Sequence, residues 1–224
     1  MTRPRVKICG IREPADGVAA VEDGADYIGV VFAERVRRVT PVEAASVVSA
    51  IRGRGVAVGV FVDEPLDDVL AVRDVVGFEI AQLHGDEPPA WCARLRADGL
   101  SVWKAIRPRA ADELARALDR YRDAVDAVLV EGFSPRAAGG TGTSFPHEWL
   151  GDADLRDLDL VLAGGLDAQN VGTAIHAVRP DVVDVSSGVE STPGVKSREL
   201  VRVFIEAVRE AASTPPSATE GRVR

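Results

Sequence analysis

The chain has 224 residues, of which 46% are hydrophobic and 28% are charged, a balance typical of globular proteins and not of disordered or fibrous ones. Its formal net charge of −8 disfavours the strongly basic surface that a nucleic-acid partner requires. It has only two cysteines and no apolar run long enough for a signal peptide or a membrane helix. We therefore expect a cytoplasmic protein with free thiols that binds neither nucleic acid nor a membrane.

Short apolar runs rich in β-branched residues recur along the chain and predict strands. Eight of them are found, at residues 6–9, 26–32, 56–62, 79–84, 102–106, 127–131, 158–163 and 182–186. Segments with helical spacing of apolar residues lie between consecutive runs, as in 44–51 and 114–121. The pattern predicts an α/β fold made of eight βα units.

The strands lack a clean alternation of apolar and polar residues, which indicates a parallel sheet buried on both faces. Eight units in this length fit the compact end of the (β/α)8 TIM barrel. A doubly wound open sheet is the structural alternative, but its GxGxxG fingerprint is missing after the first strand, which ends in residues 9–12, CGIR. We expect one barrel domain over residues 1–212 and a disordered tail over 213–224.

Polar residues lie at the carboxyl ends of several predicted strands, where TIM barrels place their active sites. Cys9 ends the first strand, Arg37 lies in the loop after the second, His84 follows the fourth, and Glu131 ends the sixth. Asp184 lies near the end of the eighth. These residues are the candidates for chemistry.

Glycine-rich segments follow the last three strands. The predicted phosphate-binding residues are Gly140, Gly142, Gly164, Gly165, Ser186, Ser187 and Gly188. Glycine lets the backbone N–H groups approach an anion, and many barrels bind a phosphate at the loops after strands seven and eight. A small phosphorylated molecule is therefore the expected ligand.

Each of these residues also has a purely structural interpretation. A glycine pair is often only a turn, Cys9 would ordinarily be a small buried hydrophobe, and His84 a core histidine with satisfied hydrogen bonds. Cys92, in a helix outside the barrel, is expected to be a structural thiol. Cys9, His84, Glu131 and Asp184 lack the spacing of known metal motifs, so we expect no metal.

Five segments taken in order resemble the phosphoribosylanthranilate isomerase family. They are KICGI at 7–11, QLHGDE at 82–87, GGTG at 139–142, LAGGL at 162–166 with Asn170 and Val171, and VDVSSGVE at 183–190 with PGVK at 193–196. The resemblance runs from about residue 7 to 204. It implies a barrel of the ribulose-phosphate-binding type.

The resemblance implies an Amadori rearrangement in tryptophan biosynthesis that converts N-(5-phosphoribosyl)anthranilate to 1-(2-carboxyphenylamino)-1-deoxyribulose 5-phosphate, without a cofactor. It assigns the base to Cys9 and the acid to the end of strand six, and it places Arg37 near the anthranilate carboxylate. His84 and Asp184 would line the pocket. A thiol needs help from a cation to act as a thiolate, whereas the acid must have a raised pKa. The family includes monomers and homodimers.

The chain departs from the family pattern in two places. Glu131 stands where the family has aspartate, and a displacement of the carboxyl by about 1 Å can cost about a hundredfold in rate. The segment 143–149, TSFPHEW, lacks the family lysine after the GGTG string.

Three hypotheses follow from these residues. The chain is the tryptophan-pathway isomerase with a glutamate acid, or a sister Amadori isomerase for another arylamine or amino-sugar phosphate, or a barrel that binds a phosphorylated ligand without turnover. Cys9 with Arg37 argues against the third, because a binder needs no base. Decarboxylation or epimerisation of a ribulose phosphate would need lysine, aspartate or metal ligands at particular strand ends, and we do not find them there.

Overall fold

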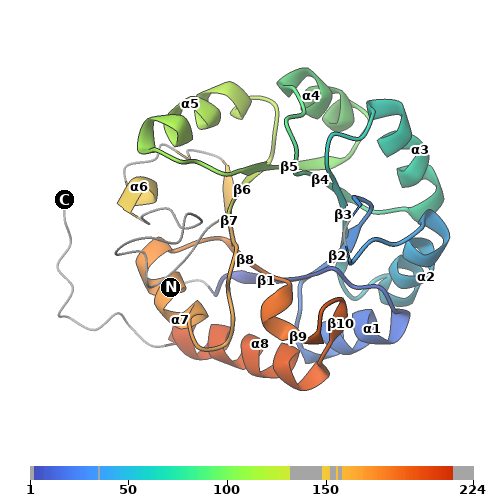
Figure 1. Cartoon of the computed structure of the whole chain (residues 1–224), viewed down its shortest axis with the longest axis vertical. Coiled ribbons are helices and arrows are strands. Elements are labelled where there is room, and N and C mark those ends of the chain that lie inside the picture. Colours follow the sequence, from blue (N-terminus) through green and yellow to red (C-terminus); the bar gives the residue numbers. More distant parts are fainter. Residues whose placement is uncertain (1–2, 35, 132–147, 152–154, 156–157, 214–224) are drawn as a thin grey trace.

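The computed structural model describes residues 3–34, 36–131, 148–151, 155 and 158–213. Eight parallel strands form a closed barrel in chain order, and β1 pairs with β8 to close it (Figure 1). The strands are β1 Arg5–Cys9, β2 Tyr27–Val31, β3 Val56–Phe61, β4 Ile80–Leu83, β5 Ser101–Ile106, β6 Ala127–Glu131, β7 Asp159–Ala163 and β8 Val182–Val185. The prediction of a (β/α)8 barrel is confirmed, and each strand lies within its predicted apolar run or extends it by one residue.

Helices surround the barrel and cover its outer face (Figure 1). They are α1 Pro14–Asp23, α2 Pro41–Ile51, α3 Leu66–Val76, α4 Pro89–Ala97, α5 Ala111–Tyr121, α6 Glu148–Gly151, α7 Val171–Val178 and α8 Arg198–Ser213. The start of α2 illustrates how the sequence sets such boundaries. Thr40 and Glu43 form a reciprocal capping box, and Pro41 occupies the first turn, where its missing N–H costs nothing.

The two largest apolar cores lie on the two sides of the barrel wall. The outer core packs the strands against the helices and contains Val6 and Ile8 of β1. The inner core fills the interior with residues such as Tyr27, Trp103 and Leu129. Because neighbouring residues of a strand face opposite sides, Lys7 points into the barrel between two outward-facing residues.

The chain after β8 adds a small feature that the apolar pattern did not predict. A 3-10 turn, η1 Ser187–Val189, leads into an antiparallel hairpin of β9 Glu190–Thr192 and β10 Val195–Lys196. Its strands are short and partly exposed, so they carry no apolar run.

The expected tail begins at Ser213, which is the last residue of α8. Its hydroxyl lies within hydrogen-bond distance of the carbonyl oxygens of Arg209 and Glu210 in the last turn of the helix. The rest of the predicted tail, 214–224, lies outside the described residues.

A buried ion pair fixes the loop after β4 to the outside of the barrel. Lys104 of β5 and Glu87 are both almost fully buried, and Lys104 Nζ lies 3.2 Å from Glu87 Oε2. Lys104 also donates to the carbonyl oxygen of Gly85, and Glu87 accepts from the backbone N–H groups of Gly85 and Asp63. This pair therefore holds the segment that carries His84.

Replacing Lys104 with methionine is expected to lower the free energy of unfolding by about 3–5 kcal/mol, because Glu87 would remain buried without its cation. Urea denaturation followed by circular dichroism measures this loss. The double variant Lys104→Met/Glu87→Gln should recover part of it. A loss below about 1 kcal/mol for the single variant would contradict the role of the pair.

Candidate active site

The predicted site residues that the structure describes come together at the carboxyl-terminal mouth of the barrel. Cys9 and Glu131 are the last residues of β1 and β6, His84 directly follows β4, and Asp184 lies in β8. Two of the predicted phosphate ligands, Gly140 and Gly142, lie outside the described residues. The barrel topology therefore joins side chains that are up to 175 residues apart, because all eight strands end on one face.

Cys9 is a free thiol at the bottom of this mouth and only 9% exposed. Burial raises the pKa of the Cys9 thiol, and the nearby ammonium of Lys7 opposes that rise without cancelling it. Asp184 raises the thiol pKa further, and Lys196 lowers it. The net shift favours the protonated thiol, so the cations around Cys9 decide how readily a thiolate forms.

Lys7 lies two residues before Cys9 on β1, on the same face of the strand, and is fully buried. Its Nζ lies 2.8 Å from Asp184 Oδ2, and the two residues face each other in the register of β1 and β8. Burial lowers the pKa of Lys7, but Asp184 and Cys9 outweigh it, so the pKa is raised. The ammonium therefore stays charged inside the barrel.

Arg37 reaches the site from the loop after β2 and is held by the hairpin that follows β8. Its Nε and Nη2 donate to the two carboxylate oxygens of Glu190 at 2.6 and 2.7 Å. Lys196 Nζ also donates to Glu190, at 2.8 Å, and to the carbonyl oxygen of Ser186. Burial raises the pKa of Glu190, but Arg37 and Lys196 outweigh it and lower the value to about 2. Arg37 is thus oriented before any anion arrives.

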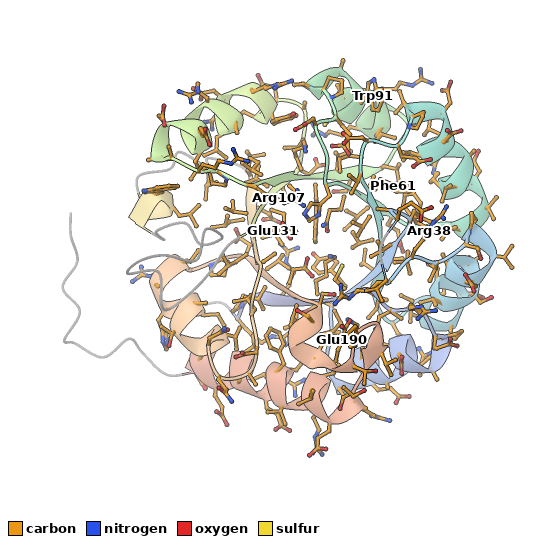
Figure 2. All side chains as sticks on the ribbon, in the orientation of Figure 1. Arg38, Phe61, Trp91, Arg107, Glu131 and Glu190 are labelled. Atoms are coloured by element: carbon orange, nitrogen blue, oxygen red, sulfur yellow. The ribbon has the colours of Figure 1, made fainter. Side chains whose placement is uncertain are left out.

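Glu131 faces a second arginine that the sequence interpretation did not single out. Arg107, directly after β5, donates its Nε to Glu131 Oε2 at 2.6 Å, and His84 Nε2 lies 3.2 Å from the same oxygen. Figure 2 shows Arg107 and Glu131 next to each other at the mouth, with Glu190 apart from them. Burial raises the pKa of Glu131, but the interactions with His84 and then Arg107 outweigh it and lower the pKa to about 2. This direction is opposite to the raised pKa that we expected of an acid.

Two buried polar atoms at the mouth, Gln82 Oε1 and Asp184 Oδ1, have no hydrogen-bond partner among the described residues. Gln82 is itself 1% exposed and its Nε2 lies 3.0 Å from His84 Nδ1. Buried polar groups in folded proteins nearly always have partners, so these two oxygens are acceptors that a bound water or a polar ligand group would satisfy. A sugar hydroxyl is able to donate a hydrogen bond to each of these oxygens.

The loops after β7 and β8 approach each other closely. Gly164 and Gly165 have φ values of +88° and +72°, which glycine adopts without strain. A Cβ on Gly188 would lie 2.0 Å from the carbonyl oxygen of Leu166, so only glycine fits at this contact. Ser186 donates its hydroxyl to the carbonyl oxygen of Cys9 and ties the second loop to β1. The two loops that carry predicted phosphate residues are therefore in direct backbone contact at Gly188 and Leu166.

Replacing Gly188 with alanine should separate these loops, because the new Cβ meets backbone and not a flexible side chain. We expect KM for a phosphorylated substrate to rise at least tenfold, with a smaller effect on kcat. Steady-state kinetics measure both. Gly172→Ala is the matched control, since its Cβ would make an ordinary contact 3.7 Å from Ala211 Cβ. An unchanged KM for Gly188→Ala would argue against phosphate binding at this contact.

Several residues at the mouth were missed by the sequence interpretation, although each carried a signal. Lys7 is two residues before Cys9 and so on the same strand face, and Arg107 follows a strand end as His84 does. Glu190 and Lys196 stand inside quoted motif strings, but their ion pairs depend on a hairpin that the apolar pattern does not predict. Cys92, by contrast, is fully buried on α4 as expected.

A cavity of about 1100 Å³ opens beside the site, between the ends of β4 and β5 and helix α5. Its lining includes His84 and Arg107. Among the described residues, no group of three or more histidine, cysteine, aspartate or glutamate side chains is arranged to hold a metal ion. In the part of the chain that the structure describes, no helix is long and apolar enough to cross a membrane.

Comparisons with known proteins agree with this geometry. The family model of N-(5'-phosphoribosyl)anthranilate (PRA) isomerase matches residues 6–207. The N-(5'-phosphoribosyl)anthranilate isomerase of Rubrobacter xylanophilus is 44% identical over 207 residues, which cover 92% of this chain and 98% of the relative.

Two solved structures are also similar over 92% of this chain and 99% of their own. Monomers of the dimeric phosphoribosylanthranilate isomerase from Thermotoga maritima match with a TM-score of 0.81 at 36% identity. A phosphoribosylanthranilate isomerase in complex with reduced 1-(o-carboxyphenylamino)-1-deoxyribulose 5-phosphate matches with a TM-score of 0.78 at 34% identity. The chain therefore belongs to the N-(5'-phosphoribosyl)anthranilate isomerase family.

Proposed function

We propose that this protein is an enzyme of tryptophan biosynthesis that isomerises N-(5'-phosphoribosyl)anthranilate to 1-(2-carboxyphenylamino)-1-deoxyribulose 5-phosphate. The observation that carries the proposal is the barrel mouth itself. It combines a thiol at the end of β1, a carboxylate at the end of β6 and glycine-rich loops after β7 and β8. The chain also belongs to a family that is named for this isomerisation.

The reaction requires one acid and one base. The acid protonates the furanose ring oxygen, the C1–O bond breaks, and the nitrogen lone pair forms a protonated Schiff base. The base then removes the proton from C2, and the C2–H electrons form the C1=C2 bond while the iminium electrons return to nitrogen. Protonation at C1 and loss of the proton from the C2 hydroxyl give the ketose. No electrons leave the substrate, so no redox cofactor takes part in these steps.

Cys9 is the proposed base and Glu131 the proposed acid. The low pKa of Glu131, about 2, means that the carboxylate must gain its proton once the substrate is bound. The substrate's own carboxylate and phosphate bring negative charge, which raises the pKa of a nearby carboxyl group. His84 Nε2, 3.2 Å from Glu131 Oε2, is placed to pass a proton to it. We therefore treat Glu131 and His84 as one proton-donating unit.

The remaining predicted residues bind the substrate in this proposal. Arg37, whose Nη1 makes no hydrogen bond with Glu190, is assigned to the anthranilate carboxylate. Asp184 Oδ1 is assigned to a ribose hydroxyl, and the backbone around Gly164, Gly165 and residues 186–188 to the phosphate. The protein is expected to act in the cytoplasm as a monomer or a homodimer.

Turnover of freshly generated phosphoribosylanthranilate, followed by the loss of its fluorescence, tests the function. We expect robust turnover by the wild type at micromolar to millimolar substrate. Absence of turnover together with tight binding of the reduced product analogue would instead indicate a binding barrel. Absence of turnover with weak binding would indicate an Amadori isomerase for another arylamine or amino-sugar phosphate.

A further inference from the structure

The barrel interior holds a buried lysine, Lys7, that has no role in the proposed acid–base steps. Lys7 is fully buried, and its Nζ is 2.8 Å from Asp184 Oδ2. Burying an ammonium is costly, and a neutral pair of apolar side chains would ordinarily stabilise the interior as well or better. Stability alone therefore does not explain a lysine at this position.

Lys7 and Cys9 approach each other beside β2 because Gly29 has no side chain. A Cβ on Gly29 would lie 2.9 Å from Cys9 Sγ and 3.2 Å from Lys7 Cε. Gly29 is paired with Cys9 in the register of β1 and β2. Glycine at this position leaves room for the thiol and the lysine side chain to share one interior space.

The charges that face Cys9 come from four elements. Lys7 is on β1, Asp184 on β8, Lys196 on β10, and Arg37 on the loop after β2. Glu190 pairs with both Arg37 and Lys196 and offsets one of their two positive charges. Among these groups the three cations exceed the two carboxylates by one charge, which a thiolate at Cys9 would neutralise. Lys7 is the cation with the strongest effect on the thiol.

We propose that Lys7 is a positioning residue that stabilises the Cys9 thiolate, with Asp184 as the counter-charge that keeps the ammonium in place. The role of the thiolate as base rests on the proposed function, but the coupling between the two side chains does not. Lys7 never contacts the substrate in this proposal. It supplies the cationic neighbour that a buried thiol needs to act as a base near neutral pH.

The test compares Lys7→Met with Asp184→Asn, because both break the same ion pair while they change the charge beneath Cys9 in opposite directions. The readouts are the absorbance of the thiolate at 240 nm against pH and the rate of alkylation by iodoacetamide. Cys92 is the other free thiol of the chain, fully buried on α4 with its pKa raised to about 11, so both readouts are made without it. A Cys92→Ala background removes its contribution.

We expect Lys7→Met to slow alkylation of Cys9 at pH 8 at least tenfold and Asp184→Asn to accelerate it, since one pKa unit changes the thiolate fraction tenfold. The turnover of Lys7→Met should fall mainly in kcat and recover as the pH is raised. If the ion pair were purely structural, both variants would shift the pKa of the Cys9 thiol in the same direction. That result would overturn the inference. Lys104→Met, which removes a buried lysine from the outer side of the barrel wall, controls for general destabilisation.

If Lys7→Met does not fold, Lys7→Met/Asp184→Asn leaves no charge beneath Cys9 and restores a neutral interior. Its thiol should titrate above that of Asp184→Asn, and equal titration curves would refute the role of Lys7. If the wild type turns over substrate and Lys7→Met leaves the pKa of the Cys9 thiol unchanged, this inference is refuted and the proposed function stays intact. Opposite shifts without turnover by the wild type would support the coupling and refute the proposed function.

Discussion

Replacing Cys9 with alanine is expected to lower kcat/KM for phosphoribosylanthranilate by about 10³–10⁴-fold, because removal of a general base commonly has an effect of that size. Fluorescence loss under steady-state conditions measures it. The dissociation constant of the reduced product analogue should change far less, since Cys9 acts on the C2 proton and does not anchor the substrate. Cys9→Ser should also be severely impaired, because a hydroxyl is a much weaker acid than a thiol.

Cys92→Ala provides the matched control for this prediction. Both cysteines are buried and free, but Cys92 is on α4, outside the barrel wall. Its replacement should leave kcat and KM within about twofold of the wild type, at the cost of about 1 kcal/mol of stability. Retention of more than a tenth of the wild-type kcat/KM by Cys9→Ala would show that another group takes the proton.

Replacing Glu131 with glutamine is the second prediction with a large expected effect, a loss of about 10²–10⁴-fold in kcat. Glutamine keeps the size of the side chain but has no acidic proton. Glu131→Asp keeps the acid and withdraws it by about 1 Å from Arg107 and His84, for which we expect a loss of about 10–100-fold. The pair of variants separates the need for an acid from the need for its position.

Opposite outcomes for these variants have distinct meanings. If the wild type is nearly inert and Glu131→Asp restores turnover, the native substrate is a different amino-sugar phosphate. If Glu131→Gln retains full kcat, the proton comes directly from His84, and His84→Gln should then be inactive. The first outcome therefore concerns the substrate, and the second concerns the proton donor.

The ion pair between Glu131 and Arg107 leads to a prediction about pH. The pKa of Glu131 is about 2, below its usual value of 4.5, so the native interactions of this carboxylate stabilise the fold above about pH 4.5 and are lost as the pH falls toward 2. Replacing Arg107 with methionine should raise the pKa of Glu131, which carbon-detected NMR of the labelled carboxyl measures. An unchanged pKa would show that His84 alone holds the carboxylate ionised.

Most of the fold could be predicted from the sequence, because parallel strands that are buried on both faces appear as short apolar runs. Eight apolar runs separated by helical spacing are enough to predict a barrel, and the strand ends then identify Cys9, His84 and Glu131 without any coordinates. The glycines of the last two loops were also predicted from the sequence, because they directly follow predicted strand ends. Gly164 has a positive φ, and a Cβ on Gly188 would lie 2.0 Å from a backbone oxygen. Other residues therefore fit poorly at both positions.

The charge state of the site was decided only by the tertiary structure. Whether a carboxylate is raised or lowered in pKa depends on which charges lie within a few ångströms, and Arg107 reaches Glu131 only because β5 and β6 are neighbours in the barrel. Likewise, Lys7 and Asp184 are 177 residues apart in sequence and meet because β1 closes the barrel against β8. The sequence determined which residues reach the mouth, and barrel closure determined which of them pair, because ionic interactions depend on distances through space.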